Sequence, residues 1–186
     1  MKKLVAILLL CASVQVSALE LGGVRLEDKA QVENAPLVLN GAGVRSAIFF
    51  DVYAAGLYLA EKKNSAEAVL ADGGAKRIAL HVLKEGDIKH FIENIRKGVG
   101  KNRSESEVAT LGERLGAFDQ LFAGIEKAKK GDVIALDWVP GEGTRVRLND
   151  KELGRIAGED FYRALLSVWI GDKPAKDKLK KELLGG

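Results

Sequence analysis

Hydrophobic positions change their spacing along the chain, and the changes divide its first half into strands and a short helix. Residues 21–26 and 37–59 are rich in Val, Ile, Phe and Tyr, are punctuated by glycine and lack helical spacing, so both stretches are predicted to be strands. Residues 77–83 alternate in the manner of a half-buried strand. Residues 65–71 are predicted to form a short helix between these strands.

Two longer helices follow, because after residue 86 the apolar residues recur at intervals of three and four. The stripe of the first helix consists of Ile88, Phe91, Ile92 and Ile95. Asp87 is its expected N-cap, and Gly98 and Gly100 are expected to end it. The second helix is expected to start at Ser104, whose hydroxyl can cap it while Glu107 reaches back in a capping box.

The last third of the chain is predicted to form a meander of strands and then two helices. The strands are expected over residues 132–139, 144–148 and 153–157. A helix is expected over residues 159–171, and Pro174 is expected to open the last one. Strands and helices fall in blocks without a repeating βαβ unit, so the predicted fold class is α+β, a mostly antiparallel sheet with helices on one face.

The N-terminus has the pattern of an export signal. Two lysines follow the initiator methionine, residues 4–10 form an unbroken apolar run, and residues 16–18 are suited to cleavage after Ala18. The run is too short to cross a bilayer, which takes about 20 apolar residues. We therefore expect a signal peptide over residues 1–18 and a mature single domain over residues 19–186, periplasmic or secreted and without an integral membrane segment.

Charge and cysteine content narrow the classes of function. The net charge of +3 includes Lys2 and Lys3, so the mature chain carries +1, which argues against nucleic-acid binding. Cys11 is the only cysteine and lies in the predicted signal peptide, so the mature chain has no disulfide and no thiolate metal site. His81 and His90 lack the carboxylates that would complete a metal site, and no P-loop, GxSxG or HExxH motif is present. We therefore expect no metal and no cofactor.

The most distinctive segment has the sequence Leu-Asn-Gly-Ala-Gly-Val-Arg over residues 39–45, and residues 50–59 follow it as an aromatic stretch that ends in Gly-Leu-Tyr-Leu. The glycines at 41 and 43 are expected to form a tight turn rather than a dinucleotide loop. The segment resembles the chalcone isomerase family, whose members carry a GxGxR turn that leads into an aromatic strand ending in GxYL. Residues 87–94 and 161–171 resemble two helices of that family, so the likeness covers most of the mature chain. It implies an open-faced β-sandwich with a long antiparallel sheet, a helical layer on one face and a ligand cleft between them.

The resemblance gives weaker support to the plant isomerase reaction. Arg45 matches the arginine that helps to hold the phenolate oxygen in the plant enzymes, and Asn94 matches a family asparagine. The other matched positions differ: Tyr53 replaces the catalytic threonine, Asp87 replaces a tyrosine, and Tyr162 and Arg163 replace a threonine/serine pair. Because groups placed to hydrogen-bond a substrate are replaced by groups of other size and charge, flavonoid isomerisation is not the leading hypothesis.

The non-catalytic plant relatives bind fatty acids and hold the carboxylate with an arginine of this turn and a tyrosine of the next strand. Arg45 and Tyr53 match that pair in residue type, and a guanidinium and a phenol suit a carboxylate. On one continuous strand the two residues would lie about 27 Å apart, so they can meet only if the chain reverses near Ser46 and Ala47. In the alternative interpretation, Arg45 pairs with a nearby carboxylate and Tyr53 fills the core.

Three functional hypotheses follow. The leading one is an exported binding protein for a small amphipathic carboxylate such as a fatty acid, with Arg45, Tyr53 and Asn94 as ligand-binding residues. The second is an isomerase or intramolecular lyase on a non-flavonoid substrate, with Arg45 and Asn94 as its catalytic candidates. The third is an interaction module without a small ligand, whose cleft its own side chains would fill. Phe49 and Tyr58 are expected to pack in the core.

Overall fold

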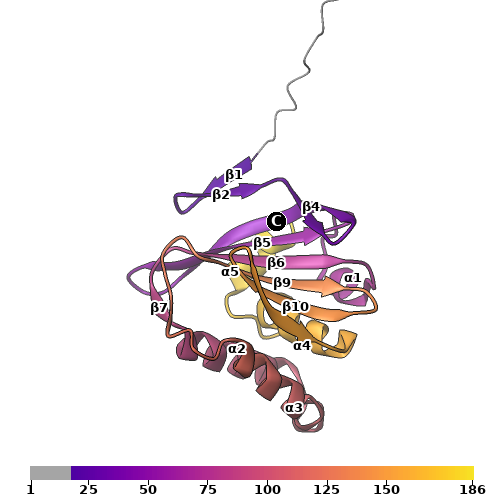
Figure 1. Ribbon diagram of the computed structural model, residues 1–186. Helices are drawn as coiled ribbons and strands as arrows, with labels where there is room; N and C mark the ends of the chain where they lie inside the picture. The colour runs from indigo at the N-terminus through magenta and orange to yellow at the C-terminus, as the bar shows by residue number, and fades with distance from the viewer. Residues whose placement is uncertain (1–17) are drawn as a thin grey trace, which may run out of the picture.

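Seven strands form one curled antiparallel sheet in the computed structural model, which describes residues 18–186 (Figure 1). The strands are β3 (Lys29–Val32), β4 (Ala35–Ser46), β5 (Asp51–Leu59), β6 (Lys76–Val82), β9 (Val133–Val139), β10 (Gly143–Leu148) and β11 (Lys151–Ile156). Their order across the sheet is β11-β10-β9-β6-β5-β4-β3, and every neighbouring pair is antiparallel. The expected α+β class, with its antiparallel sheet, is confirmed.

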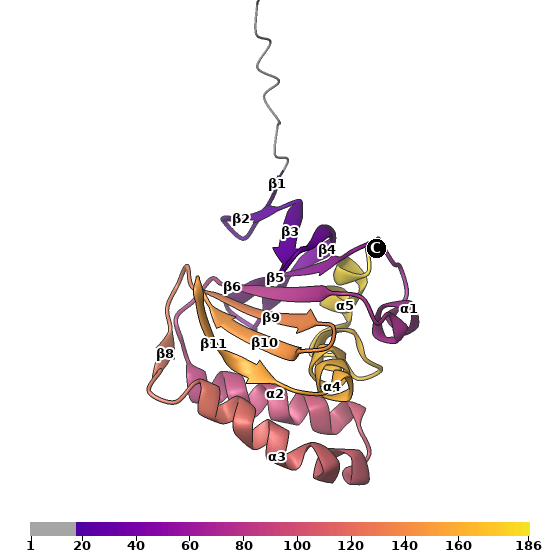
Figure 2. The ribbon, with the colours of Figure 1, turned by 45° about the vertical axis from the view of Figure 1, so that its right-hand side comes forward.

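The helices pack against one face of this sheet. They are α1 (Ala66–Ala71), α2 (Ile88–Asn102), α3 (Glu105–Leu121), α4 (Glu159–Ile170) and α5 (Asp177–Leu183). Figure 2 shows α2 and α3 side by side along one side of the sheet, while α4 contacts both α2 and β10 and α5 contacts β4. A two-residue ladder of β7 (Gly86–Asp87) and β8 (Lys127–Ala128) ties the start of α2 to the segment after α3. None of the helices in the described part is long and apolar enough to cross a membrane.

The main core lies between the sheet and the helices. In β9, Ile134, Leu136 and Trp138 face the helical layer, because alternate side chains of a strand point to the same face of the sheet. Their neighbour Asp137 points to the other face, where it is fully buried and accepts hydrogen bonds from Arg77 and Arg145 of the adjacent strands. Since both guanidinium groups meet the same carboxylate, the buried charge is compensated within the sheet.

The first strand prediction needs correction. Residues 21–26 are not one strand, because β1 (Ala18–Leu21) and β2 (Val24–Glu27) form a hairpin. The turn is made by Gly22 and Gly23, whose φ angles of 59° and 78° suit glycine. The predicted signal peptide lies outside the described residues, except for Ala18 at the start of β1.

The starts of α2 and α3 were predicted correctly, whereas the end of α2 was not. Asp87 and Ser104 cap α2 and α3 as expected, and Glu107 completes the capping box of α3. Gly98 and Gly100, however, do not end α2, which continues to Asn102. Gly98 instead faces α4, where a Cβ atom would lie 2.7 Å from Cγ1 of Val168, so this glycine permits two helices to approach closely.

The last helix also begins later than predicted. Helix α5 starts at Asp177, three residues after Pro174, with Lys176 in an extended conformation as its N-cap. The intervening chain is held to the end of α4, since the backbone N–H of Ala175 donates to the carbonyl of Val168 at 2.8 Å. The segment therefore runs along α4 before it can turn into a helix.

Gly41 and Gly43 do not form the expected tight turn. Both lie inside β4, and neither has a positive φ angle. Helix α5 crosses the strand at this point: a Cβ atom on Gly41 would lie 2.7 Å from the carbonyl oxygen of Leu183, and one on Gly43 would lie 2.8 Å from Cβ of Glu182. The glycines are needed because the helix packs directly on the strand backbone.

Candidate functional site

The β4–β5 hairpin brings Arg45 and Tyr53 together. The chain reverses over residues 47–50, where the backbone N–H of Ala47 donates to the carbonyl of Phe50 at 2.7 Å. Arg45 and Tyr53 are then direct partners in the antiparallel register, and the Cζ atom of Arg45 lies 5.8 Å from the centroid of the Tyr53 ring. The reversal that the fatty-acid hypothesis required near Ser46 and Ala47 is therefore present.

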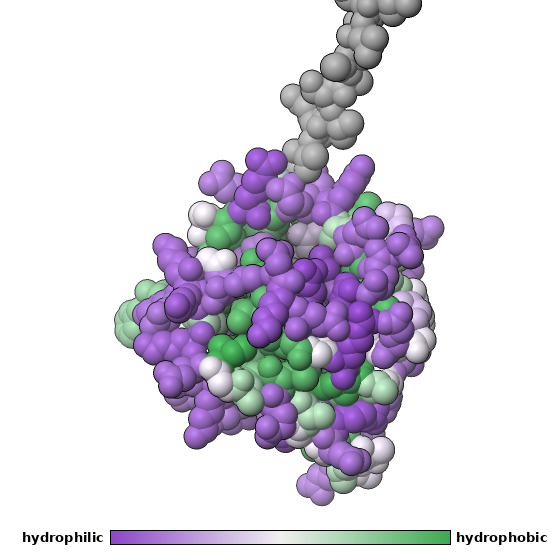
Figure 3. Space-filling view, in the orientation of Figure 1, coloured by the Kyte–Doolittle hydropathy of each residue, from purple (hydrophilic) through white to green (hydrophobic). Residues whose placement is uncertain are grey.

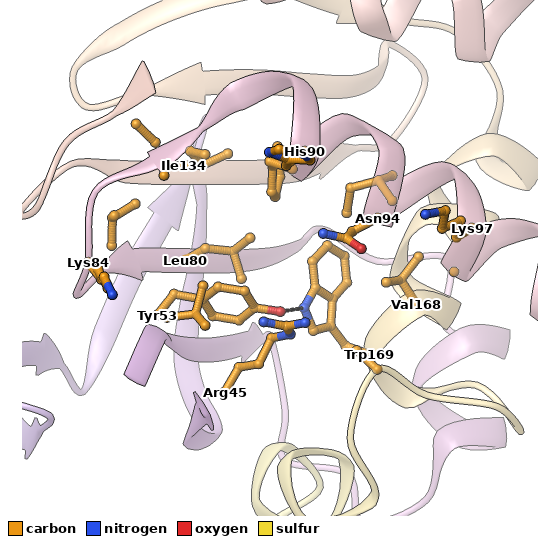
Figure 4. Close-up of a pocket in the computed structure, with 18 of the residues that line it drawn as sticks. Arg45, Tyr53, Leu80, Lys84, His90, Asn94, Lys97, Ile134, Val168 and Trp169 are labelled. Carbon is orange, nitrogen blue, oxygen red and sulfur yellow. Dashed lines mark hydrogen bonds between the residues drawn. The ribbon is translucent and has the colours of Figure 1, made fainter. Parts of the chain in front are cut away.

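Arg45 and Tyr53 line a cavity of about 370 Å³ between the sheet and the helices α2 and α4 (Figure 4). Its walls are largely apolar. The apolar lining includes Leu80, Val82, Ile134, Phe91, Ile95 and Val168. The volume falls in the range of about 300–1,000 Å³ that is usual for small-molecule sites. The side chains of this part of the chain therefore leave an open space and do not fill it.

A hydrogen bond between Trp169 and Tyr53 sets the orientation of the phenol. The indole Nε1–H of Trp169 donates to the hydroxyl oxygen of Tyr53 at 2.9 Å, and Figure 4 shows the guanidinium group of Arg45 beside this pair. An indole N–H can only donate, so the Tyr53 oxygen is the acceptor and its own O–H is left for another partner. Tyr53 thus has a proton to offer toward the cavity.

Electrostatics favour a neutral phenol next to a charged guanidinium. Burial raises the pKa of Tyr53, although the hydrogen bond from Trp169 and the charge of Arg45 act in the opposite direction. Among residues 18–186, Arg45 has no carboxylate within salt-bridge distance, and its side chain contacts the Tyr53 ring. The alternative in which Arg45 pairs with a nearby carboxylate is therefore not what the structure contains. The arrangement can receive an anion with one positive charge and one O–H donor.

Asn94, the third candidate, lies at the mouth of the cavity. It is exposed on α2, its side chain makes no hydrogen bond to any other described residue, and Figure 4 shows it on the helix that passes over Trp169. His90 lines the mouth one turn earlier on the same helix. The cavity thus combines a polar end at Arg45 and Tyr53 with a second polar group at its rim.

Sequence reasoning missed Trp169 as a site residue. With Phe161, Leu165 and Val168 it forms the apolar stripe of the helix expected over residues 159–171, which indicates a core residue, and it is 1% exposed. The chemistry of the indole gave the one usable signal, because a buried indole needs an acceptor for its N–H. The hydroxyl of a tyrosine on a facing strand can be that acceptor. The stripe alone could not indicate which residue would meet it.

The positions at which this chain departs from the plant isomerases have other roles here. Asp87 caps α2 by accepting from the backbone N–H of Lys89 at 2.7 Å. Tyr162 is buried and Arg163 pairs with Glu159, and neither of them lines the cavity. The exchanges at positions 162 and 163 therefore do not by themselves change the cavity wall, whereas Asp87 lines the cavity.

The two expected core aromatics differ in outcome. Tyr58 is buried in a smaller cluster on the outer face of the sheet, as predicted. Phe49 is 90% exposed, so the core prediction for it is wrong. The reason is the hairpin: Phe49 lies in the turn between β4 and β5, beyond the edge of the packed sheet.

Possible metal ligands do not gather in the structure. Within residues 18–186 no group of three or more His, Cys, Asp or Glu side chains is arranged to hold a metal ion. His81 lies on β6 and His90 on α2, and neither has the further ligands that a metal site would need.

Comparison with known proteins places these features in context. A family model described as chalcone isomerase-like matches residues 18–185. A search of curated proteins found no match. Among solved structures, a fatty-acid binding protein from Arabidopsis thaliana is similar, with a TM-score of 0.70 and 18% sequence identity over 90% of this chain and 96% of that one. At this identity the likeness concerns the fold.

Proposed function

The chain belongs to the chalcone isomerase-like family, and we propose that it binds a small amphipathic carboxylate, such as a fatty acid, in the cavity between its sheet and helices. The observation that carries this proposal is the position of Arg45. Its guanidinium group stands at one end of an apolar cavity without a carboxylate partner among the described residues. A cation in such a place is suited to an anionic ligand.

In the proposed complex, each part of the ligand meets a different part of the cavity. The carboxylate would accept hydrogen bonds from Arg45 and from the free O–H of Tyr53, which Trp169 orients. The hydrocarbon tail would lie against the apolar walls from β6, β9 and α2. Asn94 would contribute a polar contact at the mouth. Each group of an amphipathic ligand then meets a surface of matching polarity.

Two further observations support the ligand class and the location. The similar Arabidopsis thaliana protein is a fatty-acid binding protein, and its fold covers nearly the whole of this chain. The export signal expected over residues 1–18 would place the protein in the periplasm or outside the cell. We therefore propose that the protein carries its ligand outside the cytoplasm.

The two alternatives have less support. An isomerase or intramolecular lyase on a non-flavonoid substrate would use Arg45 and Asn94, both of which line the cavity, but no additional contact favours catalysis. An interaction module without a ligand would be expected to fill its cleft with its own side chains, whereas about 370 Å³ remain open. The binding proposal requires an open apolar cavity with a cation at one end, and the described residues provide both.

Native mass spectrometry of the purified protein tests the proposal. We expect a co-purifying or added fatty acid at one molecule per chain. Arg45→Ala should weaken the affinity for added fatty acid by about 10- to 100-fold, since a hydrogen bond to a charged group contributes about 1.5–3 kcal/mol. Arg96→Ala is the matched control, because Arg96 pairs with Asp119 on the outside of the helical layer and does not line the cavity. No bound lipid, together with unchanged affinity in Arg45→Ala, would refute the proposal.

A further inference from the structure

The turn between β4 and β5 exposes an unusual amount of apolar surface. Among the described residues, only four large hydrophobic side chains are exposed, and three of them are Ile48, Phe49 and Phe50. Ile48 and Phe49 are 89% and 90% exposed. Turns are normally built from Gly, Asn, Asp, Ser and Pro, so bulky apolar residues are not needed to reverse the chain. We call residues 48–50 the apolar tip. It projects at the left of Figure 1, where the space-filling view shows an apolar protrusion surrounded by hydrophilic surface (Figure 3).

The apolar tip adjoins the mouth of the cavity. Phe50 belongs to both, because it lines the cavity and ends the tip. The Nζ atom of Lys84 lies 3.5 Å from the centroid of the Phe50 ring and lines the same mouth. Anything that covers the tip therefore also faces the entrance to the ligand site.

The lining of the cavity carries an excess of positive charge. Five basic residues line the cavity and its rim, namely Arg45, Lys84, Lys97, Lys101 and Lys173. None of the five forms a salt bridge with another residue of the described chain. The acidic residues of the lining are two, and both are engaged: Glu85 pairs with Lys127, and Asp87 caps α2. At the tip itself, Lys84 lies against Phe50, and the carboxylate of Asp51 accepts a hydrogen bond from the hydroxyl of Ser46. The charge of the cavity lining as a whole is therefore cationic.

We propose that the apolar tip inserts into an anionic lipid surface, with Ile48 and Phe49 in the interfacial layer and the cationic rim facing the headgroups. Apolar side chains combined with a basic surround are the arrangement by which peripheral proteins hold such a surface. A second copy of the chain is a poorer fit, because a stable interface buries about 800 Å² on each partner, far more than a turn of this size offers. The cavity would then open at the membrane, so that an amphipathic ligand could pass between the bilayer and the site.

Co-sedimentation with vesicles of equimolar phosphatidylcholine and phosphatidylglycerol tests this inference. The double variant Ile48→Ser/Phe49→Ser should partition at least about tenfold less, because it removes both inserting side chains. Leu19→Ser is the matched control, since Leu19 is also exposed and apolar but lies on the β1–β2 hairpin. Wild-type partitioning should fall with added salt and on vesicles of phosphatidylcholine alone.

Two further variants check the two components separately. Lys84→Gln should weaken partitioning by about fivefold, the effect of one cation near an anionic surface. Phe49→Trp should shift its fluorescence to shorter wavelength when the anionic vesicles are added. Unchanged partitioning of the double variant, or unchanged emission of Phe49→Trp, would overturn the inference. A self-association that the double variant abolishes, without vesicle binding, would identify the tip as an interface between copies and would overturn it as well.

The membrane inference can fail independently of the proposed function. Ile48 and Phe49 do not line the cavity, so the double variant should bind a fatty acid in vesicle-free solution as the wild type does. Retained fatty-acid binding without vesicle binding would refute only the membrane inference. Vesicle binding without fatty-acid binding would refute only the proposed function.

Discussion

The indole N–H of Trp169 and the hydroxyl oxygen of Tyr53 are 2.9 Å apart, and this hydrogen bond joins the last core helix to the β4–β5 hairpin inside the cavity. Its direction matters for function, because the indole can only donate. The phenol accepts this bond at its oxygen, so its own proton remains available for another acceptor, which in the proposed function is the ligand carboxylate. Tyr53 is therefore both a contact between sheet and helix and a donor directed to the same end of the cavity as Arg45.

Removing the hydroxyl tests both roles of Tyr53 at once. We expect Tyr53→Phe to weaken fatty-acid binding by about tenfold or more, because one hydrogen bond to the carboxylate is lost. We also expect it to lower the free energy of unfolding by about 1–3 kcal/mol, because the buried indole N–H of Trp169 loses its acceptor. Calorimetric titration and urea denaturation measure the two effects.

Trp169→Phe is the informative counterpart, because it removes the donor and leaves the Tyr53 hydroxyl in place. Trp169→Phe should lower the free energy of unfolding, while its affinity for the fatty acid should fall less than the affinity of Tyr53→Phe does. A Tyr53→Phe variant that binds the ligand as the wild type does would show that the hydroxyl is only structural.

Binding should depend little on pH between the ionisation of the ligand and that of Tyr53. A carboxyl group of this kind titrates at about pH 4–5, so affinity should fall as the pH is lowered through that range and the ligand loses its charge. Burial raises the pKa of Tyr53 above 10, so its O–H remains a donor at all lower pH values. Affinity should therefore stay within about twofold from about pH 6 to 9.5. Titrations of wild type and of His90→Gln, which removes an imidazole at the mouth, check this, and a steep loss of affinity near pH 8 in both proteins would contradict it.

The same shift in the pKa of Tyr53 has a consequence for stability. A pKa that is raised in the folded state gives a stabilising contribution that is fully present below the unfolded value, near pH 10. The contribution is lost as the pH rises from there through the folded value. Denaturation midpoints above pH 10 should therefore fall less steeply in Tyr53→Phe than in the wild type, and equal slopes would show that another group dominates.

Two glycines of α2 form a matched pair for the helix contact. Gly98→Ala should destabilise the fold by about 1–3 kcal/mol, because its methyl group would lie 2.7 Å from Cγ1 of Val168 on α4. Gly100→Ala should instead be neutral or stabilise by up to about 1 kcal/mol, because nothing lies within 4 Å of its Cβ position and alanine favours the helix. Thermal or urea denaturation of both variants is the measurement. Equal effects would mean that the contact between α2 and α4 is not the reason for Gly98.

The same glycines show why the end of α2 could not be predicted from the sequence. Local propensity assigns Gly98 and Gly100 to a helix terminus, whereas Gly98 serves a contact with Val168, which lies 70 positions away in the sequence. Gly41 and Gly43 were mispredicted for the same reason. They lie inside β4 and leave room for α5, a helix that is distant in the sequence. Caps such as Asp87 depend on neighbours in sequence and were predicted correctly. Contacts between segments that are distant in the sequence, such as that of Gly98 with Val168, were not predicted.

Part of the candidate site could be predicted from the sequence. Arg45 and Tyr53 could be named from residue types, but only the hairpin register places them opposite each other. Trp169 could not be named, because its role depends on how α4 lies over β5. Phe49 was misplaced because hydrophobic character predicts burial, and a turn can expose an apolar side chain for contact with something outside the chain.

The most direct test of the account compares dodecanoate with dodecanol in calorimetric titrations of the wild type and of Arg45→Ala. The two ligands share the tail and differ in the carboxylate, so their difference reports the polar end of the cavity alone. We predict that the wild type prefers dodecanoate by at least about tenfold and that Arg45→Ala loses this preference while it still binds the alcohol. Equal affinity of the wild type for both ligands, or a preference that survives in Arg45→Ala, would contradict the assignment of Arg45 as the carboxylate-binding residue.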